Sequence, residues 1–362
     1  YLGNITGGAA ITSTGALTID AGSVDFGNVI NGGHLSITSS SSIDTGTITG
    51  ATYNVTLASG NNGNITLGTL GTDSAYVGIV GITPHGTGVI STSGNWYTNQ
   101  ATLGATTLSG NFTLTTSDDA VSLGHVKGAH NLTIDSGTGN ITLSSLGVEA
   151  TKLANLTLTT TGTKTASGTW HIDNAFSTGA LVLGGALTAI TSNDNMTFGA
   201  ITGNYNLSLT SGSGTITLAN IGTSSADVGN LTLSSSAAVS ASGNWYLGNI
   251  TGDAAITSTG ALTIDAGSVD FGNIINGANL SITSTSSIDT GTITGSTYNV
   301  TLASGSNGNI TVGALGEDGA AVGTVSMTPN GTGVISTAGD WYTNQTTLGA
   351  TTLSGNLSIT TS

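Results

Sequence analysis

Along this chain, two apolar residues repeatedly flank a single hydroxyl residue. The alternation has the period of two that places one face of a strand in a core and the other in water. Each triplet is too short to be stable alone, so it must pair with neighbouring strands. The clearest triplets are Leu17–Ile19, Leu35–Ile37, Val55–Leu57, Phe112–Leu114, Leu132–Ile134, Leu156–Leu158, Leu207–Leu209 and Leu231–Leu233.

These triplets return every 18 to 32 residues, and a second triplet often follows after 9 or 10 residues. Gly, Ser, Asn and Asp fill the intervals, which is typical of turns. No segment of 10–15 residues carries helical apolar spacing. We therefore predict an all-β fold, a parallel β-helix (β-solenoid) of short strands with about 20 residues per coil.

A much longer repeat contains this short one. Residues 1–117 recur as residues 246–362, and 95 of the 117 aligned positions are identical. We expect the sequence to be a window on a longer tandem array. A 245-residue period of about twelve coils should advance ~55–60 Å along the coil axis, because stacked strands lie ~4.8 Å apart.

An intermediate repeat ends in Ser or Ala, Gly, any residue, then Trp. Residues 131–170 align with residues 206–245 without a gap. We predict modules at 1–96, 97–170 and 171–245, with 246–362 starting the next period, in a continuous rod without independent globular domains. The module-end residues Trp96, Trp170, Trp245 and Trp341 should pack at coil corners; the alternative is an aromatic row for sugar stacking.

The two long copies indicate which side chains are buried. Volume is conserved between Val29 and Ile274, between Leu67 and Val312, and between Leu114 and Ile359, as packed cores require. By contrast, Tyr76 and Thr72 correspond to Ala321 and Glu317. We expect the conservative pairs inside the coil and the drastic ones at its surface.

Charge excludes several functions. Three Lys and Arg residues stand against 18 Asp and Glu, which gives a net charge of −15. Nucleic acid is an unsuitable partner because its phosphates require basic side chains. No apolar run approaches the ~18–20 residues of a membrane helix, so we predict no membrane insertion in this window. Scarce trypsin sites suit an extracellular or cell-surface location, and targeting signals should lie outside the window.

Candidate catalytic residues are sparse. His34 and His85 correspond to Asn279 and Asn330 in the second copy, and no catalytic role survives that exchange. His125 and His130 flank Lys127 in a turn-rich segment, where we expect surface residues.

The carboxylates that could serve glycoside hydrolysis are Asp118 with Asp119, Asp20 with Asp25, and Asp265 with Asp270. Arg is absent, and Lys127, Lys152 and Lys164 lie outside the duplicated part. We therefore predict no catalysis and no enzyme.

Two ligand hypotheses concern the turns. Acidic turns can bind calcium, but the nonapeptide calcium pattern is missing, so we predict no cofactor and keep calcium as a weaker hypothesis. Without Cys, thiolate metal sites and disulfides are excluded.

Asn directly precedes many triplets, and we predict that these residues form a structural ladder between coils. The alternative is glycosylation at Asn-x-Ser/Thr. The predicted ladder consists of Asn54, Asn131, Asn155, Asn206, Asn230 and Asn299.

Runs such as Gly139-Asn140-Ile141-Thr142-Leu143 and Gly229-Asn230-Leu231-Thr232-Leu233 resemble the repeat region of the filamentous-haemagglutinin-like family. This resemblance implies a right-handed β-helix in a giant bacterial surface or secreted protein that acts as a fibrous adhesin.

Together these observations favour a non-enzymatic shaft of an extracellular filament or giant cell-surface adhesin. We expect head-to-tail continuation with further repeats or identical subunits, and surface glycans are candidate partners. One alternative is a carbohydrate-binding or carbohydrate-cleaving β-helix at the cell surface. Another is a surface-layer or sheath component.

Overall fold

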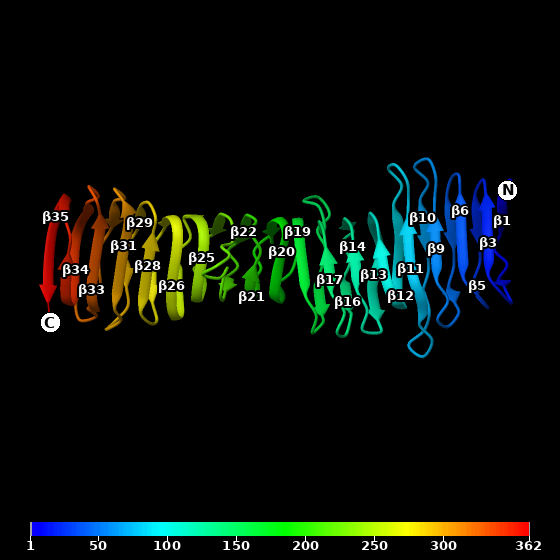
Figure 1. Ribbon diagram of the computed structural model, residues 1–362, viewed down its shortest axis with the longest axis horizontal. Coiled ribbons are helices and arrows are strands. Elements are labelled where there is room, and N and C mark those ends of the chain that lie inside the picture. Colours follow the sequence, from blue (N-terminus) through cyan, green and yellow to red (C-terminus); the bar gives the residue numbers. More distant parts are fainter. Residues whose placement is uncertain (1, 362) are drawn as a thin grey trace. The chain divides into compact units, whose positions relative to one another are not determined.

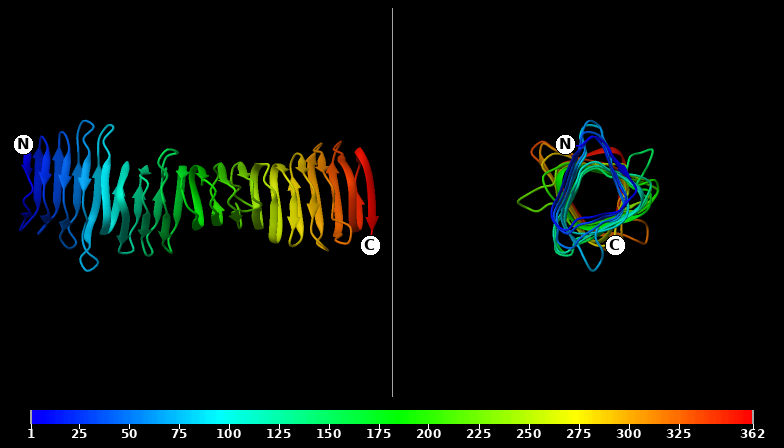
Figure 2. Two further views of the ribbon diagram at one scale, coloured as in Figure 1. Left: turned by 180° about the vertical axis from the view of Figure 1, so that it is seen from behind. Right: turned by 90° about the vertical axis from the view of Figure 1, so that its right-hand side faces the viewer.

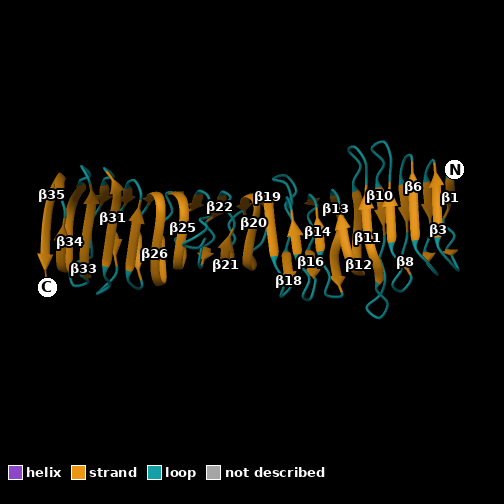
Figure 3. Ribbon diagram, viewed as in Figure 1, coloured by secondary structure: helices purple, strands orange, loops and turns teal. Residues whose placement is uncertain are grey.

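A computed structural model describes residues 2–361, and strands are its only regular elements (Figure 3). The chain is a β-solenoid of about 18 turns, which confirms the predicted fold class; the right-handed winding stays a prediction. It divides into two compact units, Tyr1–Phe176 and Ser177–Ser362. Across residues 2–361 there is no helix of the length and apolarity that crossing a membrane requires.

In the first unit the chain winds through short strands joined by turns, coloured from blue to green in Figure 1. Its strands are β1 (Ile5–Gly7), β2 (Ile11–Thr12), β3 (Leu17–Ala21), β4 (Val24–Phe26), β5 (Val29–Ile30), β6 (Leu35–Ser39), β7 (Ile43–Thr45), β8 (Ile48–Thr49), β9 (Val55–Ala58), β10 (Ile65–Leu67), β11 (Val77–Thr83), β12 (Ile90–Leu103), β13 (Thr106–Thr116), β14 (Val121–Leu123), β15 (Val126–Lys127), β16 (Leu132–Asp135), β17 (Ile141–Leu143), β18 (Leu156–Thr159) and β19 (Lys164–His171).

The second unit has the same construction. Its strands are β20 (Phe176–Ile190), which begins on the last residue of the first unit, β21 (Met196–Thr202), β22 (Leu207–Gly212), β23 (Ile216–Leu218), β24 (Leu231–Ser235), β25 (Val239–Thr251), β26 (Ile256–Phe271), β27 (Ile274–Asn276), β28 (Leu280–Ser284), β29 (Ile288–Thr290), β30 (Ile293–Thr294), β31 (Val300–Ser306), β32 (Ile310–Val312), β33 (Val322–Asn330), β34 (Ile335–Leu348) and β35 (Thr351–Thr361).

Strands of successive coils pair in parallel and in register, so equivalent apolar residues stack. In the first unit Phe112 pairs with Leu132, which pairs with Leu156. In the second unit Leu207 pairs with Leu231. Within each unit the strands wind around a central space and the turns project outward, as the end-on view in Figure 2 shows. The apolar side chains fill that space, so each unit has one narrow core that is continuous from coil to coil.

Several strands are longer than the predicted triplets. β12, β25 and β34 each continue through a corner of the coil. Their registers shift beside a glycine of positive φ, for example between Thr92 and Gly94 (φ 84°) and between Ala241 and Gly243 (φ 83°). Glycine adopts this conformation without steric cost, and the strand therefore bends instead of ending.

The prediction from the two copies holds at most positions. Val29, Ile274, Leu67, Val312 and Leu114 are buried. Thr72 and Glu317 are exposed, and Tyr76 and Ala321 are half-buried. Ile359 was expected inside, but it is 42% exposed because β35 pairs with β34 alone among the described strands.

Candidate functional site

The four module-end tryptophans lie inside the coils, each with no exposed surface. Trp245 stacks between Ile221 of the preceding coil and Ile264 of the following one. Trp96 also meets Phe112 edge-on, with ring centroids 5.0 Å apart. Their ring faces are covered by other side chains, so they offer no platform for a saccharide.

Each indole N–H is also satisfied inside the coil, where it donates to a backbone carbonyl 26 or 28 residues earlier in the chain. A buried N–H without an acceptor would be costly, so this bond fixes the ring in its corner. The bonds run from Trp96 to Gly68 (2.9 Å), from Trp170 to Ser144 (2.7 Å), from Trp245 to Ala219 (2.7 Å) and from Trp341 to Gly313 (3.1 Å).

One turn per module projects beside each of these tryptophans. Each turn is closed by two backbone hydrogen bonds in a short antiparallel bridge. The turns comprise residues 72–75, 148–151, 223–226 and 317–320. The residue after each Trp is half-buried, because alternate residues of a strand face opposite sides. These residues are Tyr97, His171, Tyr246 and Tyr342.

A glycine ties each turn to its neighbouring strand. Gly316 has a φ of +64°, and a Cβ there would lie 2.4 Å from the carbonyl oxygen of Tyr342. Gly71, Gly147 and Gly222 have the same conformation and the same close approach. The turn therefore lies tightly against the residue after the Trp, and the sequence specifies this contact in all four modules.

In the first copy, the space beside Tyr97 is filled. The Tyr76 ring lies edge-on to the Tyr97 ring, with centroids 5.6 Å apart and planes at 76°. Burial raises the pKa of Tyr76 above its ordinary value, and nearby Asp73 raises it further. Tyr76 therefore stays neutral at physiological pH and acts as a packing residue.

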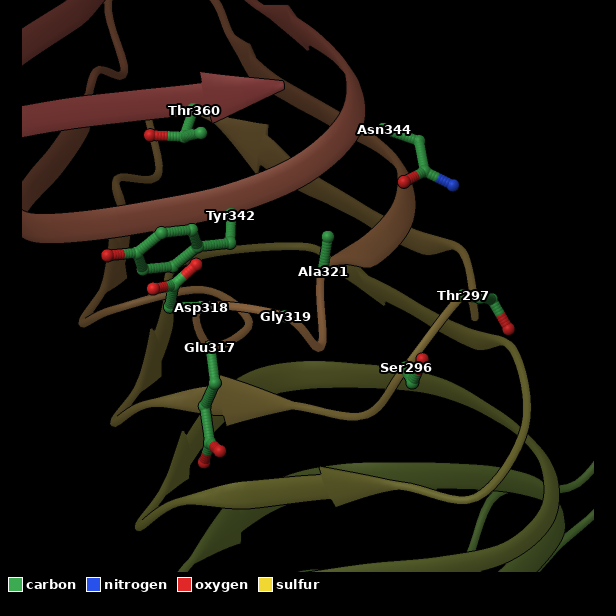
Figure 4. A pocket seen from close by; sticks show the side chains of 9 residues that line it. All are labelled: Ser296, Thr297, Glu317, Asp318, Gly319, Ala321, Tyr342, Asn344 and Thr360. Carbon is green, nitrogen blue, oxygen red and sulfur yellow. The ribbon is translucent and has the colours of Figure 1, made fainter. Parts of the chain in front are cut away.

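In the second copy, Ala321 replaces this tyrosine, and a pocket of about 280 Å³ lies beside Tyr342. Figure 4 shows the Asp318 carboxylate projecting toward the Tyr342 ring, whereas the Glu317 carboxylate projects away from it. The pocket is lined by Ser296, Thr297, Glu317, Asp318, Gly319, Ala321, Tyr342, Asn344 and Thr360. It is a half-open site whose lining combines polar side chains with one aromatic face and contains no basic residue.

Asparagine side chains link successive coils as hydrogen-bond acceptors. Asn54 Oδ1 accepts the backbone N–H of Ile79 at 2.9 Å, and Asn299 accepts that of Thr324 at 2.9 Å. Similarly, Asn206 and Asn230 accept the backbone N–H groups of Asn230 (2.9 Å) and Asn249 (3.0 Å).

A side-chain contact links the remaining two predicted asparagines. Asn131 Oδ1 accepts from the amide of Asn155 at 2.7 Å, while the backbone N–H of Asn131 donates to Asn111. Of the six predicted ladder residues, the structure thus joins Asn131 to Asn155 and Asn206 to Asn230, whereas Asn54 and Asn299 bond to other residues of neighbouring coils.

The exchange of His34 for Asn279 has a structural cause. His34 Nδ1 accepts the backbone N–H of Asn54 at 3.0 Å, and Asn279 Oδ1 accepts the backbone N–H of Asn299 at the same distance. Both residues supply one acceptor to the next coil, so the position requires an acceptor and not imidazole chemistry.

A second asparagine series was missed by the sequence reasoning, although several members also directly precede a triplet. Each accepts a backbone N–H of the following coil. They are Asn28, Asn64, Asn140, Asn195, Asn220, Asn273 and Asn309.

The other catalytic candidates lie apart. His85 Nδ1 contacts the carbonyl oxygen of Ser59 at 2.8 Å, and His125 Nε2 contacts that of Gly147 at 3.2 Å. Asp118 accepts the backbone N–H of Thr138 at 3.0 Å, as the ladder asparagines do. Within residues 2–361, no group of three or more His, Cys, Asp or Glu residues is placed to hold a metal ion.

Two carboxylate pairs form that the sequence reasoning did not propose. Asp25 stacks on Asp44 in neighbouring coils, and Asp270 stacks on Asp289. Asp20 lies on another strand, opposite Thr38. Burial raises the pKa values of Asp44 and Asp289, and the stacked carboxylates raise them further. The pairing needed knowledge of the coil register, which spacing along the chain does not give.

Comparison with known proteins gives no match to a family, to a curated sequence or to a solved structure.

Proposed function

We propose that this chain is part of the non-enzymatic shaft of an extracellular filament or giant cell-surface adhesin. The observation that carries the proposal is the in-register stacking of apolar residues from coil to coil within each unit. Such a structure can lengthen by repetition, because each coil contacts only its neighbours and adds ~4.8 Å. A spacer needs this property more than it needs any single site.

The asparagine series supports a load-bearing role. Each accepting side chain adds one hydrogen bond between coils beyond the strand pairing, as in the bond from the Thr324 N–H to Asn299. These bonds join the same successive coils that the strand hydrogen bonds join. A force that separates two coils must break both sets together, so the turns resist opening as well as the strands.

The contacts of the histidine and aspartate residues that were candidates for catalysis also support a structural role. His34 and Asp118 accept backbone N–H groups from the next coil. His85 and His125 contact turn carbonyl groups. Their polar atoms hold turns in place, which is a use that a spacer requires.

The surface fits an extracellular, repetitive protein. The net charge of −15 keeps neighbouring molecules soluble and repels nucleic acid and anionic lipid. In the first copy, Leu108 and Leu114 of β13 are buried where the strands of the following coil pair with β13. Further repeats or identical subunits are the proposed partners, as in the filamentous-haemagglutinin-like family that the repeats resemble.

The test adds one further 245-residue period to the chain and measures particle length by negative-stain microscopy and cross-section by small-angle X-ray scattering. The expected result is a gain of ~55–60 Å at unchanged cross-section. A fusion to an unrelated globular domain of equal mass is the control. A wider particle, or beads joined by flexible links, would contradict the shaft.

A second assay addresses the catalytic alternative. Incubation of the purified chain with a panel of polysaccharides should release no reducing sugar above the level of a buffer control. Release that grows with protein concentration would show an enzyme and overturn the proposal.

A further inference from the structure

We propose that the pocket beside Tyr342 binds the pyranose ring of a neutral saccharide. The proposal goes beyond the mechanical role and is independent of it. It depends on how the second copy differs from the first around this one position.

The lining residues of the pocket differ between the copies more often than the other residues do. Over the duplicated segment 22 of 117 positions differ, since 95 are identical, whereas 4 of the 9 lining residues differ. Two of the four reduce bulk, because Ala321 stands where the first copy has Tyr76 and Gly319 stands where it has Ser74. Of the other two, Ser296 adds a hydroxyl group where the first copy has Ala51, and Glu317 exchanges the hydroxyl of Thr72 for a carboxylate. Together the four exchanges open a space beside Tyr342, and Ser296 adds a hydroxyl group to its lining.

The retained residues supply the binding surface. Tyr342, Asp318 and Asn344 have the same identity in both copies. In the first copy the Tyr76 ring covers the equivalent Tyr97, with centroids 5.6 Å apart. Loss of that ring in the second copy leaves the Tyr342 ring facing the pocket (Figure 4). An aromatic surface of this kind can cover the C–H groups of a flat ligand.

The polar groups favour a sugar. The Asp318 carboxylate projects toward the ring and can accept hydrogen bonds from two neighbouring hydroxyl groups. The hydroxyl groups of Ser296 and Thr297 can both donate and accept. A volume of about 280 Å³ lies just below the usual range of about 300–1,000 Å³ for ligand sites, which suits a ligand as small as one sugar ring.

The same groups disfavour an anionic ligand and suit a neutral ring better than a simple cation. A uronic acid would bring its carboxylate to Asp318 with no basic lining residue to offset the repulsion. An ammonium group would use the Asp318 carboxylate and the Tyr342 ring but would leave the hydroxyl groups of Ser296 and Thr297 without a partner. A neutral ring can use the aromatic face, the Asp318 carboxylate and these hydroxyl groups together.

The experiment uses saturation-transfer-difference NMR on the complete chain with methyl glycosides of glucose, galactose and mannose. Methyl glucuronide and n-butylammonium serve as charged probes. Ala321→Tyr introduces the residue that the first copy has at the equivalent position, Tyr76. Because the first copy accommodates a tyrosine there, this variant should fold. Tyr342→Ala removes the aromatic face. Tyr205→Ala is the control, since Tyr205 is 47% exposed in the same unit and does not line the pocket.

The expected result is saturable binding of at least one neutral glycoside, with saturation transfer to the ring C–H protons. Ala321→Tyr and Tyr342→Ala should each weaken it at least tenfold, a loss of about 1.4 kcal/mol, and Tyr205→Ala should not. Absence of binding by all three neutral glycosides, or equal binding by Ala321→Tyr, would overturn the proposal. Tighter binding of n-butylammonium or of methyl glucuronide than of the neutral glycosides would contradict the proposal that the ligand is a neutral saccharide.

Discussion

Removal of the Trp245 side chain should open the second unit at one corner. Trp245 has no exposed surface and stacks between Ile221 and Ile264. An aromatic side chain buries ~150–250 Å², and at ~25 cal/mol per Å² this corresponds to about 4–6 kcal/mol. Measured truncations of buried aromatic residues cost about 3–5 kcal/mol. We expect a loss of that size for Trp245→Ala.

Two further variants separate packing from hydrogen bonding. Trp245→Phe keeps an aromatic ring but leaves the Ala219 carbonyl without the N–H that donates to it at 2.7 Å, which should cost about 1–3 kcal/mol. Trp245→Leu loses the same bond but matches the aliphatic residues above and below it. It should therefore be less harmful than Trp245→Ala.

The assay combines urea unfolding, followed by circular dichroism, with hydrogen exchange measured by mass spectrometry. Exchange should accelerate mainly in β23, β25 and β26, because each coil depends on its immediate neighbours. Tyr246→Phe, on the half-buried neighbour, is the control and should change stability by less than about 0.5 kcal/mol. If Trp245→Ala changes stability no more than Tyr246→Phe, the corner does not stabilise the coil.

Three other predictions concern particular positions. Raised pKa values mean that folded Asp44 and Asp289 hold protons more tightly than the unfolded chain. Their full contribution to stability is therefore present below pH ~3.9 and lost as the pH rises through the folded pKa. Asp289→Asn should raise the free energy of unfolding by a few tenths to about 1 kcal/mol at pH 7 and should not raise it at pH 3. Asp265 lies opposite Thr283 and is the control. An equal gain from Asp265→Asn would exclude repulsion between paired carboxylates as the cause. Thr290 is 2% exposed, and its hydroxyl has no hydrogen-bond partner among the described residues. Thr290→Val should raise the free energy of unfolding by about 1 kcal/mol in urea titrations, with the exposed Thr301→Val as an expected neutral control. Gly316→Ala should lower the melting temperature more than Gly319→Ala, because both have positive φ but only a Cβ at Gly316 meets a backbone oxygen; equal shifts would show that the contact is relaxed at little cost.

The site was partly accessible to sequence reasoning. The Trp motif marked four equivalent positions, and the copies indicated that Tyr76 and Ala321 lie toward the surface. Nothing in the spacing placed Ala321, Asp318 and Tyr342 around one space, because they come from a turn and a strand that meet only when coils stack. The edge-on contact between the rings of Tyr76 and Tyr97 could not be predicted from the sequence for the same reason.

The sequence by itself determined the kind of fold. Alternation within triplets such as Leu132–Ile134 indicates a strand with one buried face, and the regular return of the triplets indicates a stack of coils. It also determined most of the buried positions, since a packed core tolerates only exchanges that conserve volume. Only the tertiary structure decided which residues from different coils meet, such as Asp270 with Asp289 and Asn299 with Thr324. Coil lengths vary, so the register between coils depends on how many residues each turn contains, and that is settled by three-dimensional packing.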